Sequence, residues 1–312
     1  MNASRRKFLK NSSLSVAGAL FLSRCGSSKA AMPAGGNAGD TLLGIQLYSL
    51  REDMKKDPLG TMKALAEIGY KNVEHANYVN GKFYGYEPAE FKKVLDDLGL
   101  KMPSGHTVMN ASHWDKSAND FTDVWKKTVT DAALVGQHYV ISPWLAEGLR
   151  KNYDDMVAFM DVFNKCGELC QKSGMKFGYH NHDFEFKESL NGQNLYDIIL
   201  DKTDPNLVIQ QIDVGNMYGG GGIALDVIKK HPGRFQSMHV KDEIKASGEG
   251  EMGNSYESTV LGKGILPVKD IVAAGIKTGG TKDLIVEQES YQGLTPMAAA
   301  KQDFEIMKDW GY

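Results

Sequence analysis

Short apolar runs alternate with longer stretches of helical periodicity from residue 42 onward. The apolar runs have the length of buried strands, and each is followed by a stretch whose apolar positions recur every three to four residues. The helical stretches tend to end in glycine, and several begin beside proline or aspartate, as helix caps require. The pattern predicts strands at 42–50, 72–76, 101–106, 139–144, 176–180, 207–215, 235–240 and 283–289, each followed by a helix.

Repeated strand–helix units of this kind predict an α/β fold with a parallel sheet. Eight units in residues 41–312 fit a single closed (β/α)8 barrel, which is the fold we expect. A doubly wound open sheet is the alternative. Such sheets carry a glycine-rich nucleotide-binding turn after the first strand, and the segment "IQLYSLRED" has no glycine pair.

The first forty residues have a different character and predict an export signal with a flexible tether. The paired arginines of "SRRKFLK" are typical of the twin-arginine route, and the apolar run 14–22 is too short to span a membrane. We therefore expect a periplasmic protein. Cys25 is one candidate for a lipid anchor, which would be the only membrane attachment, and cleavage near Ala30 or Ala31 is the alternative.

The net charge of the chain argues against one class of partner, nucleic acid. The chain has a net charge of −3, and its leader carries six lysines and arginines but no acid before Asp40. The part after the leader therefore has a net charge of about −9, which is a poor match for nucleic acid.

The expected strand ends carry the chemistry. In a (β/α)8 barrel the site lies where strands end and the following loops begin. Carboxylates and imidazoles that converge there would be left unpaired unless a cation compensates them, so the sequence predicts a divalent metal ion. The polar and aromatic residues at or just after these strand ends are Glu74, His75, His106, Trp144, His180, His182, Glu185, Asp213, Asn216, His239, Lys241, Asp242, Glu287 and Glu289.

With these residues identified, the chain resembles the xylose isomerase-like barrel family of sugar phosphate isomerases and epimerases. The resemblance rests on "YHNHDFEF", "IDVGN", "MHVKD", "LGKG" and "VEQE", in that order, and covers nearly all of the chain after the leader. It implies one Mn²⁺, Mg²⁺, Co²⁺ or Zn²⁺ ion. The ligands that it implies are an acid after the fifth strand together with Asp213, His239 and Glu287.

The sequence departs from the family pattern at two places. His180 stands at the end of the fifth strand, where many relatives have a glutamate. We expect Glu185, the nearest acid, to reach back as the ligand, with His180 as the substitute. Asn216 stands where many epimerases have a histidine.

A metal with oxygen and imidazole ligands and an open position can hold a sugar carbonyl and its neighbouring hydroxyl, and it can stabilise the enediolate that forms when a base removes a proton. Histidine is a base near neutral pH, and Lys241 follows His239 by two residues on the same side of the strand. The candidate acids and bases are His180, His182, Glu185 and Lys241.

Other strand-end residues are candidates for binding the substrate. Tyr48 and Trp144 could stack against a sugar ring or could pack in the core. Glu74 and His106 could bind hydroxyls or could complete a layer of hydrogen bonds, and Asn216 is a further polar contact.

These observations predict a metal-dependent sugar isomerase or epimerase that acts on an unphosphorylated sugar or keto-sugar. The expected export and the lack of strand-end arginines, Arg51 on the first loop apart, argue against a sugar phosphate. One alternative is a metal-dependent lyase that cleaves 3-keto-glycosides. A non-catalytic, exported sugar-binding barrel is another. The expected partner is a small carbohydrate, and a homo-oligomer is left open.

Overall fold

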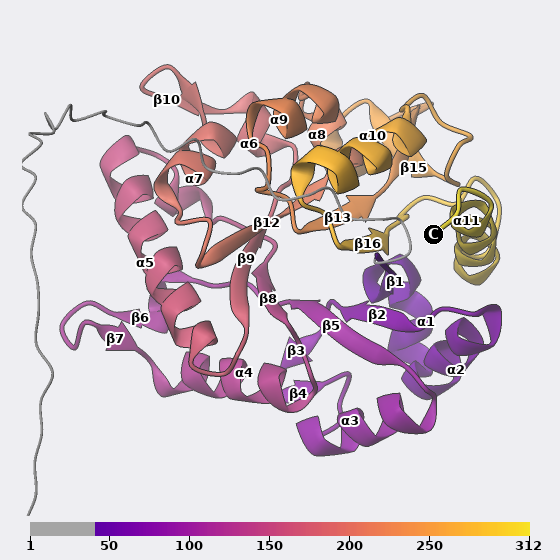
Figure 1. Cartoon of the computed structure of the whole chain (residues 1–312), viewed down its shortest axis with the longest axis horizontal. Helices are drawn as coiled ribbons and strands as arrows, with labels where there is room; N and C mark the ends of the chain where they lie inside the picture. The colour runs from indigo at the N-terminus through magenta and orange to yellow at the C-terminus, as the bar shows by residue number, and fades with distance from the viewer. Residues whose placement is uncertain (1–40) are drawn as a thin grey trace, which may run out of the picture. The chain divides into compact units, whose positions relative to one another are not determined.

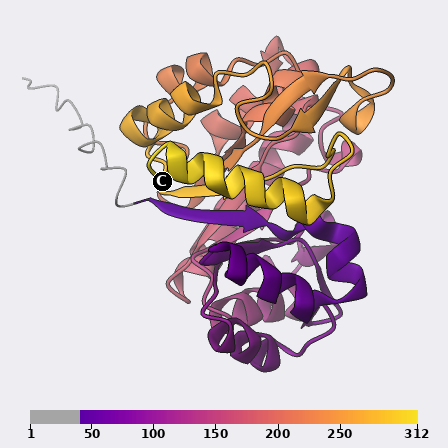
Figure 2. The ribbon, with the colours of Figure 1, turned by 90° about the vertical axis from the view of Figure 1, so that its right-hand side faces the viewer.

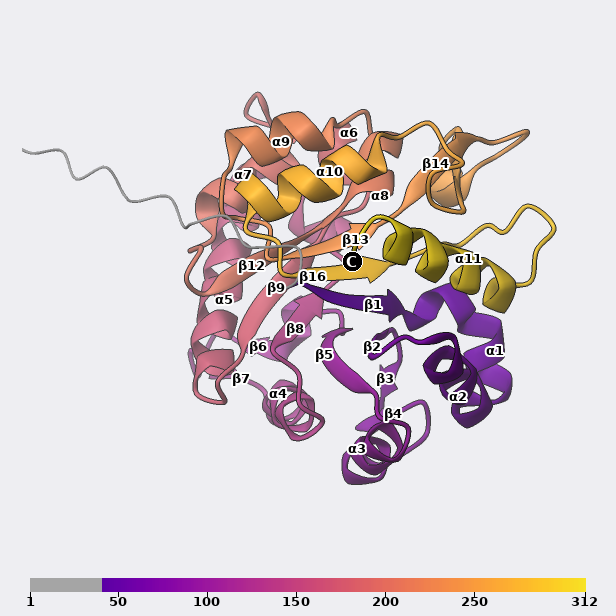
Figure 3. The same cartoon turned by 45° about the vertical axis from the view of Figure 1, so that its right-hand side comes forward.

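Eight parallel strands close into a barrel in the computed structural model, which describes residues 41–312 (Figure 1). Each strand pairs with its neighbours along the chain, and β16 pairs with β1 to complete the ring (Figure 3). The predicted (β/α)8 barrel is therefore confirmed. The barrel strands are β1 (Leu42–Gln46), β2 (Asn72–His75), β5 (Lys101–His106), β8 (Tyr139–Ser142), β9 (Lys176–His180), β12 (Val208–Asp213), β13 (Ser237–Val240) and β16 (Asp283–Val286).

Helices follow every barrel strand and form the outer layer. Their ends carry the expected caps: Asp57 accepts from the backbone N–H of Gly60, and Thr295 accepts from that of Ala298. The helices are α1 (Arg51–Lys56), α2 (Pro58–Ile68), α3 (Pro88–Asp97), α4 (Asp123–Leu134), α5 (Tyr153–Gln171), α6 (Phe184–Lys187), α7 (Leu195–Lys202), α8 (Val214–Gly219), α9 (Ala224–Lys230), α10 (Val268–Ala274) and α11 (Pro296–Asp309).

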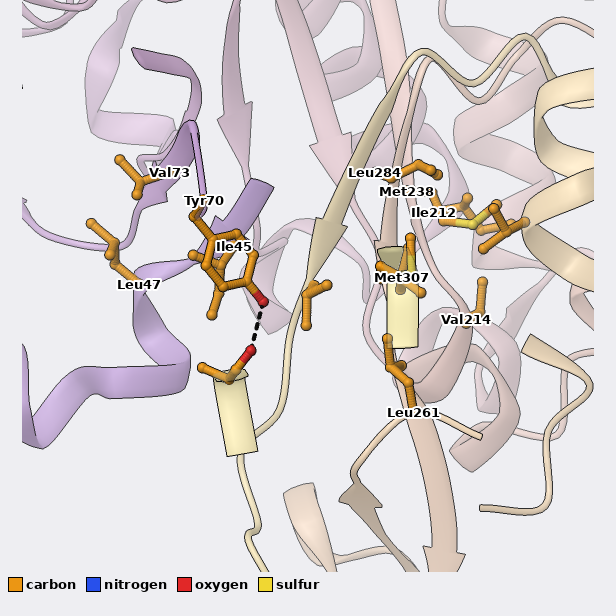
Figure 4. Packing of buried hydrophobic residues seen from close by; sticks show 14 of the residues in the cluster. Ile45, Leu47, Tyr70, Val73, Ile212, Val214, Met238, Leu261, Leu284 and Met307 are labelled. Atoms are coloured by element: carbon orange, nitrogen blue, oxygen red, sulfur yellow. Dashed lines mark hydrogen bonds between the residues drawn. The ribbon is translucent and has the colours of Figure 1, made fainter. Parts of the chain in front are cut away.

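Apolar side chains between the strands and the helices pack the last helix of the barrel against its first strand–helix units. The last helix, α11, lies beside the first strand (Figure 2). Tyr70, fully buried before β2, donates its hydroxyl to the carbonyl of Ala300 in α11 at 3.0 Å, and it packs with Ile45 and Met307 in the same cluster (Figure 4). This contact satisfies a buried hydroxyl and holds the closing helix in place.

The predicted first strand, 42–50, is too long. The strand ends at Gln46, and residues Leu47–Leu50 form a 3-10 turn. The side-chain carbonyl of Gln46 accepts from the backbone N–H of Tyr48 at 3.1 Å, and Leu47 and Leu50 are buried. The apolar pattern of these residues therefore reflects burial in a turn instead of a longer strand.

Four of the loops at the carboxyl end of the barrel contain a short hairpin. They follow β2, β5, β9 and β13, so they extend the rim where (β/α)8 barrels carry their sites. The hairpins pair β3 (Tyr78–Val79) with β4 (Lys82–Phe83), β6 (Trp114–Asp115) with β7 (Asp120–Phe121), β10 (Ser189–Leu190) with β11 (Gln193–Asn194), and β14 (Asp242–Lys245) with β15 (Tyr256–Thr259).

The predicted export signal and the candidate lipid anchor at Cys25 lie outside the described residues and stay predictions. Within residues 41–312, no helix combines the length and the apolar character needed to cross a bilayer.

Candidate metal centre

Four side chains from neighbouring strands converge at the carboxyl end of the barrel. His180 ends β9, Asp213 ends β12, His239 lies in β13 and Glu287 follows β16. The strand register sets Asp213 directly beside His239. One ligand atom from each of the four lies within 4.8 Å of the others, and all four side chains are buried. The structure thus brings together Asp213, His239 and Glu287, which are the three ligands that the resemblance implied for the last three strands.

The donor set fits a cation. One oxygen of Asp213, Oδ1, accepts from the backbone N–H of Asn216 at 2.7 Å, whereas Oδ2 is buried without a hydrogen-bond partner. Oδ2 lies 3.7 Å from Nδ1 of His239 and 3.9 Å from Nε2 of His180. A buried carboxylate oxygen with no donor is costly, and a divalent ion among these atoms would satisfy it.

Each histidine of the group is oriented by a second buried side chain. Nε2 of His239 lies 2.6 Å from Oε1 of Glu74, which leaves its Nδ1 facing the group. Nδ1 of His180 lies 3.1 Å from Oε1 of Gln211, which leaves its Nε2 facing the group. Gln211 in turn donates to Oε2 of Glu74 at 2.8 Å. Contacts of this kind fix the ring orientation of metal-binding histidines.

Glu74 was expected either to bind a substrate hydroxyl or to complete a layer of hydrogen bonds. The structure places it among the buried side chains that contact His239 and Gln211. Its side chain is fully buried and also accepts from Gln46 and Ser104. Burial alone would raise the pKa of Glu74, but His106 and His239 lower it to about 2. Glu74 is therefore ionised, and it orients His239 from beneath, which is the second of the two roles that the sequence left open.

We expect Glu74→Gln to weaken metal binding roughly 10- to 100-fold, the usual cost of losing a partner that orients a ligand histidine. The barrel should stay folded, because glutamine can keep the contacts with Ser104 and Gln46. Metal titration monitored by calorimetry, with circular dichroism to verify folding, would measure this. Undiminished affinity in a folded variant would contradict the role of Glu74.

Glu185→Gln is the matched control for Glu74→Gln, because both remove a buried carboxyl group near the group of four. Glu185 does not reach the group of four, contrary to what we expected for the fifth strand. Its Oε1 accepts from the hydroxyl of Tyr179 at 2.5 Å, and its Oε2 accepts from the backbone N–H of His182 at 2.9 Å. Burial raises the pKa of Glu185 to about 8, so glutamine resembles the neutral acid that this position favours. This variant should bind the metal as tightly as the wild type does. A large loss of metal affinity would show that Glu185 is a ligand.

Lys241 occupies the rim of the group. Its ammonium lies 2.6 Å from Oε1 of Glu289, 3.1 Å from Oδ1 of Asn216 and 3.7 Å from Oε2 of Glu287. The side chain is fully buried, which would lower its pKa, but Glu289 and Asp213 raise that pKa well above the usual range. Lys241 is therefore a fixed positive charge pointing to the same side as His239, as the sequence indicated.

Glu251 completes the surroundings of Lys241 and was missed by sequence reasoning. It lies on a 3-10 turn (Glu251–Gly253) between β14 and β15, and its Oε2 is 3.3 Å from the Lys241 ammonium. Its Oε1 accepts from the hydroxyls of Ser258 and Ser290 at 2.6 and 2.8 Å. Nothing in the sequence of this loop distinguishes Glu251 from an ordinary surface acid.

A pocket of about 910 Å3 opens onto the group of four. Tyr48, Trp144, His106 and Asn216, all expected to contact substrate, line it, whereas the buried Glu74 does not. The pocket is also lined by His180, His182, Glu287 and Glu289.

His106 and His182 add two imidazoles to this pocket. The ring of His106 lies 5.2 Å from that of His239, and its Nε2 is 2.6 Å from Oε1 of Gln211. Nδ1 of His182 is buried without a hydrogen-bond partner, and burial lowers the pKa of this residue to about 4. His182 is therefore a neutral imidazole beside His180 of the group of four.

Comparisons with known proteins agree with this architecture. The family model for the xylose isomerase-like TIM barrel matches residues 62–310. The inosose dehydratase of Geobacillus kaustophilus is 23% identical over 198 residues, which are 58% of this chain and only 60% of that relative. The inosose dehydratase of Bacillus licheniformis is 25% identical over 229 residues, or 65% of this chain and 73% of that relative. A sugar phosphate isomerase/epimerase from Parabacteroides distasonis superposes with a TM-score of 0.73 at 27% identity, covering 86% of this chain and 98% of its own.

Proposed function

The chain belongs to the xylose isomerase-like TIM barrel family, and we propose that it is a metal-dependent isomerase or epimerase that acts on an unphosphorylated sugar or keto-sugar. The observation that carries the proposal is the group formed by His180, Asp213, His239 and Glu287, with the unpartnered Oδ2 of Asp213 among the ligand atoms. Its reaction begins by removing a proton from the carbon next to a carbonyl, which gives an enediolate.

The four residues would hold one divalent ion. Two imidazoles and two carboxylates suit Mn²⁺, Co²⁺ or Zn²⁺ better than Mg²⁺, which prefers oxygen ligands throughout. When bound, such an ion supplies a Lewis acid that polarises a carbonyl and lowers the cost of developing negative charge.

The protein's own groups supply the proton transfers. His182 lines the pocket as a neutral imidazole, so it is positioned to act as the base. Lys241 offers N–H donors to a substrate oxygen that becomes negative, and Glu289 and Asn216 hold it in place. Tyr48 and Trp144 present exposed aromatic faces to the pocket and can cover the apolar face of a sugar ring.

The charges of the pocket support an unphosphorylated substrate. A phosphate is usually held by arginine or by free lysine side chains. No arginine is among the described residues that line the pocket, and its one lysine, Lys127, lies 2.5 Å from the carboxylate of Asp131.

A lyase is the second candidate function. Loss of a substituent one carbon away from the enediolate would give elimination at the same site. The ammonium of Lys241 favours this outcome, because a fixed cation stabilises the negative charge that develops on a departing oxygen. The two relatives named as inosose dehydratases also support it.

Solvent deuterium should appear in recovered substrate when the Mn²⁺-loaded protein is incubated in D2O with free keto-hexoses and 3-keto-glucosides. The label should occupy the carbon next to the carbonyl, because proton removal is common to isomerisation, epimerisation and elimination. Mass spectrometry and proton NMR would detect it, and release of an alcohol from a 3-keto-glucoside would identify the lyase.

Chelated protein is the control and should give no label. Exchange with sugar phosphates but not with any free sugar would contradict the unphosphorylated substrate. Binding of the sugars without exchange by metal-loaded protein would favour a sugar-binding barrel over an enzyme.

A further inference from the structure

The pocket above the metal centre is larger and more apolar than a single sugar ring requires. Its volume of about 910 Å3 is close to the upper end of the roughly 300–1,000 Å3 found for pockets that enclose drug-sized ligands. A sugar ring held at the metal centre would leave the outer part of this volume unfilled.

Exposed apolar side chains gather around that outer part. Residues 41–312 contain eleven large hydrophobic side chains that are exposed, and five of them line this one pocket. Scattered exposed hydrophobic residues are normal on a protein surface, whereas several that converge on one cavity indicate a binding site. We call these five the outer pocket: Tyr48, Val79, Val124, Trp144 and Met252.

The outer pocket is assembled from five separate segments. Tyr48 follows β1, Val79 lies in β3, Val124 begins α4, Trp144 follows β8 and Met252 lies between β14 and β15. Because these segments extend from different strands, their apolar side chains surround the mouth of the barrel. They are not one face of a single helix that a neighbouring element failed to cover.

Two polar side chains in the wall near Val79 and Val124 are paired through one carboxylate. Tyr78 donates its hydroxyl to Oδ2 of Asp131 at 2.5 Å, and Lys127 donates to the same oxygen. These groups line or border the pocket, but their polar ends are paired with one another. The pocket is also lined by the polar residues Asn77, Asn80 and Thr107. Its exposed lining is nevertheless mainly apolar, so it suits an apolar ligand group better than a second polyhydroxylated ring.

The hairpin that presents Val79 is preformed. Asn80 and Gly81 at its tip have φ values of 53° and 76°, the positive values that a two-residue type I′ turn requires. Asparagine and glycine are the residues that adopt these values most readily. The Val79 side of the pocket is therefore built in advance, as tight binding of an apolar group requires.

We propose that the outer pocket binds an apolar aglycone, so that the substrate is a keto-glycoside, whose sugar ring carries the carbonyl, with an aromatic or similarly flat apolar aglycone. This inference rests on the proposed function, because it places the sugar at the metal centre and the aglycone beyond it. Tyr48 and Trp144 supply aromatic faces, and Val79, Val124 and Met252 supply aliphatic surface.

The experiment compares methyl and phenyl glycosides of glucose, galactose and xylose, in both anomers, by calorimetry with the Mn²⁺-loaded full-length protein. These probes differ only in the aglycone. For at least one sugar we expect the phenyl glycoside to bind about 10-fold more tightly than the methyl glycoside, since burial of a phenyl ring removes a large apolar area from water.

Val124→Asp should remove most of this phenyl advantage and leave the affinity for the methyl glycoside unchanged. Val124 is 67% exposed and is the second residue of α4, where an aspartate is well tolerated. Leu225→Asp is the matched control, because Leu225 is exposed, is the second residue of α9 and does not line the pocket. It should leave both affinities unchanged.

Three results would overturn the inference. They are equal affinities for the phenyl and methyl members of every pair, no binding by any phenyl glycoside, or an equal loss of both affinities in Val124→Asp. Phenol that binds as tightly as the phenyl glycosides would assign the outer pocket to an unrelated apolar ligand. Failure of the proposed function would appear separately, as the absence of deuterium exchange in both the free keto-sugars and the 3-keto-glucosides.

Discussion

Asp213→Asn is expected to abolish metal binding and turnover together. The asparagine amide would present an N–H2 group or a neutral oxygen to the position now occupied by the unpartnered Oδ2, and neither replaces a carboxylate as a ligand. Loss of a residue that only hydrogen-bonds to a ligand side chain lowers metal affinity by up to about 100-fold. Asp213 belongs to the group of four itself, so we expect its substitution to lower the affinity by more than this. Elemental analysis of protein purified without chelator should fall from about one ion per chain to near none.

The stability of the same variant provides a second measurement. An ion that binds only the folded protein stabilises it by about 2.7 kcal/mol at a concentration of 100 times its Kd. The melting temperature of the wild type should therefore rise when Mn²⁺ is added, whereas that of Asp213→Asn should not. The variant should still fold, because its backbone contact with Asn216 can be kept by the amide oxygen.

Asp303→Asn is the control for this prediction. Asp303 is also a buried aspartate, but it accepts from the backbone N–H of Leu261 and belongs to no group of potential ligands among the described residues. Its substitution should leave the metal content unchanged. A wild-type level of metal in Asp213→Asn would show that the ion, if any, binds elsewhere, and it would remove the basis of the proposed function.

Lys241→Met is expected to reduce turnover by roughly 10²- to 10³-fold, the range for loss of one positioned donor to a developing negative charge, with the ion still bound. Methionine has a similar length but neither charge nor a donor. The metal should stay, because Lys241 is not one of the four converging residues. Single-turnover kinetics with the substrate found by deuterium exchange, together with elemental analysis, would measure both quantities.

Two further variants distinguish a catalytic lysine from a structural one. Lys241→Arg keeps both the positive charge and the N–H donors among Glu251, Glu287 and Glu289, so it should recover part of the turnover that Lys241→Met loses. Lys127→Met removes the one lysine among the described residues that line the pocket, and it should change kcat only slightly. Loss of metal from Lys241→Met, or near-normal turnover in it, would contradict the proposed role.

The barrel was predictable because its evidence is periodic and repeated. Eight apolar runs each precede a helical stretch, and the caps at Asp57 and Thr295 can be recognised from residue type alone. The strand ends also placed Asp213, His239 and Glu287 in one region, since parallel strands end at the same face of a barrel.

The rest of the site depends on contacts that periodicity does not encode. Glu185 was a reasonable ligand by distance along the chain, but Tyr179 and the backbone of His182 hold it away from the group. Glu74 is buried inside the barrel because the strand register sets it beside Gln46 and Ser104. Gln211 could have been found, because it precedes Asp213 by two residues and so faces the same side of β12.

Closure of the barrel by β1 and β16 bears on how the protein is synthesised. β1 is among the first described segments to leave the ribosome, yet its partner β16 is among the last, so one edge of β1 has no barrel partner in the nascent chain. Unpaired edges of this kind invite association with other chains, so we expect the protein to be most prone to aggregation before β16 is made. Glu287 follows β16, so the group of four is complete only after nearly all of the barrel has emerged, and a metal ion held by all four residues would enter after that point.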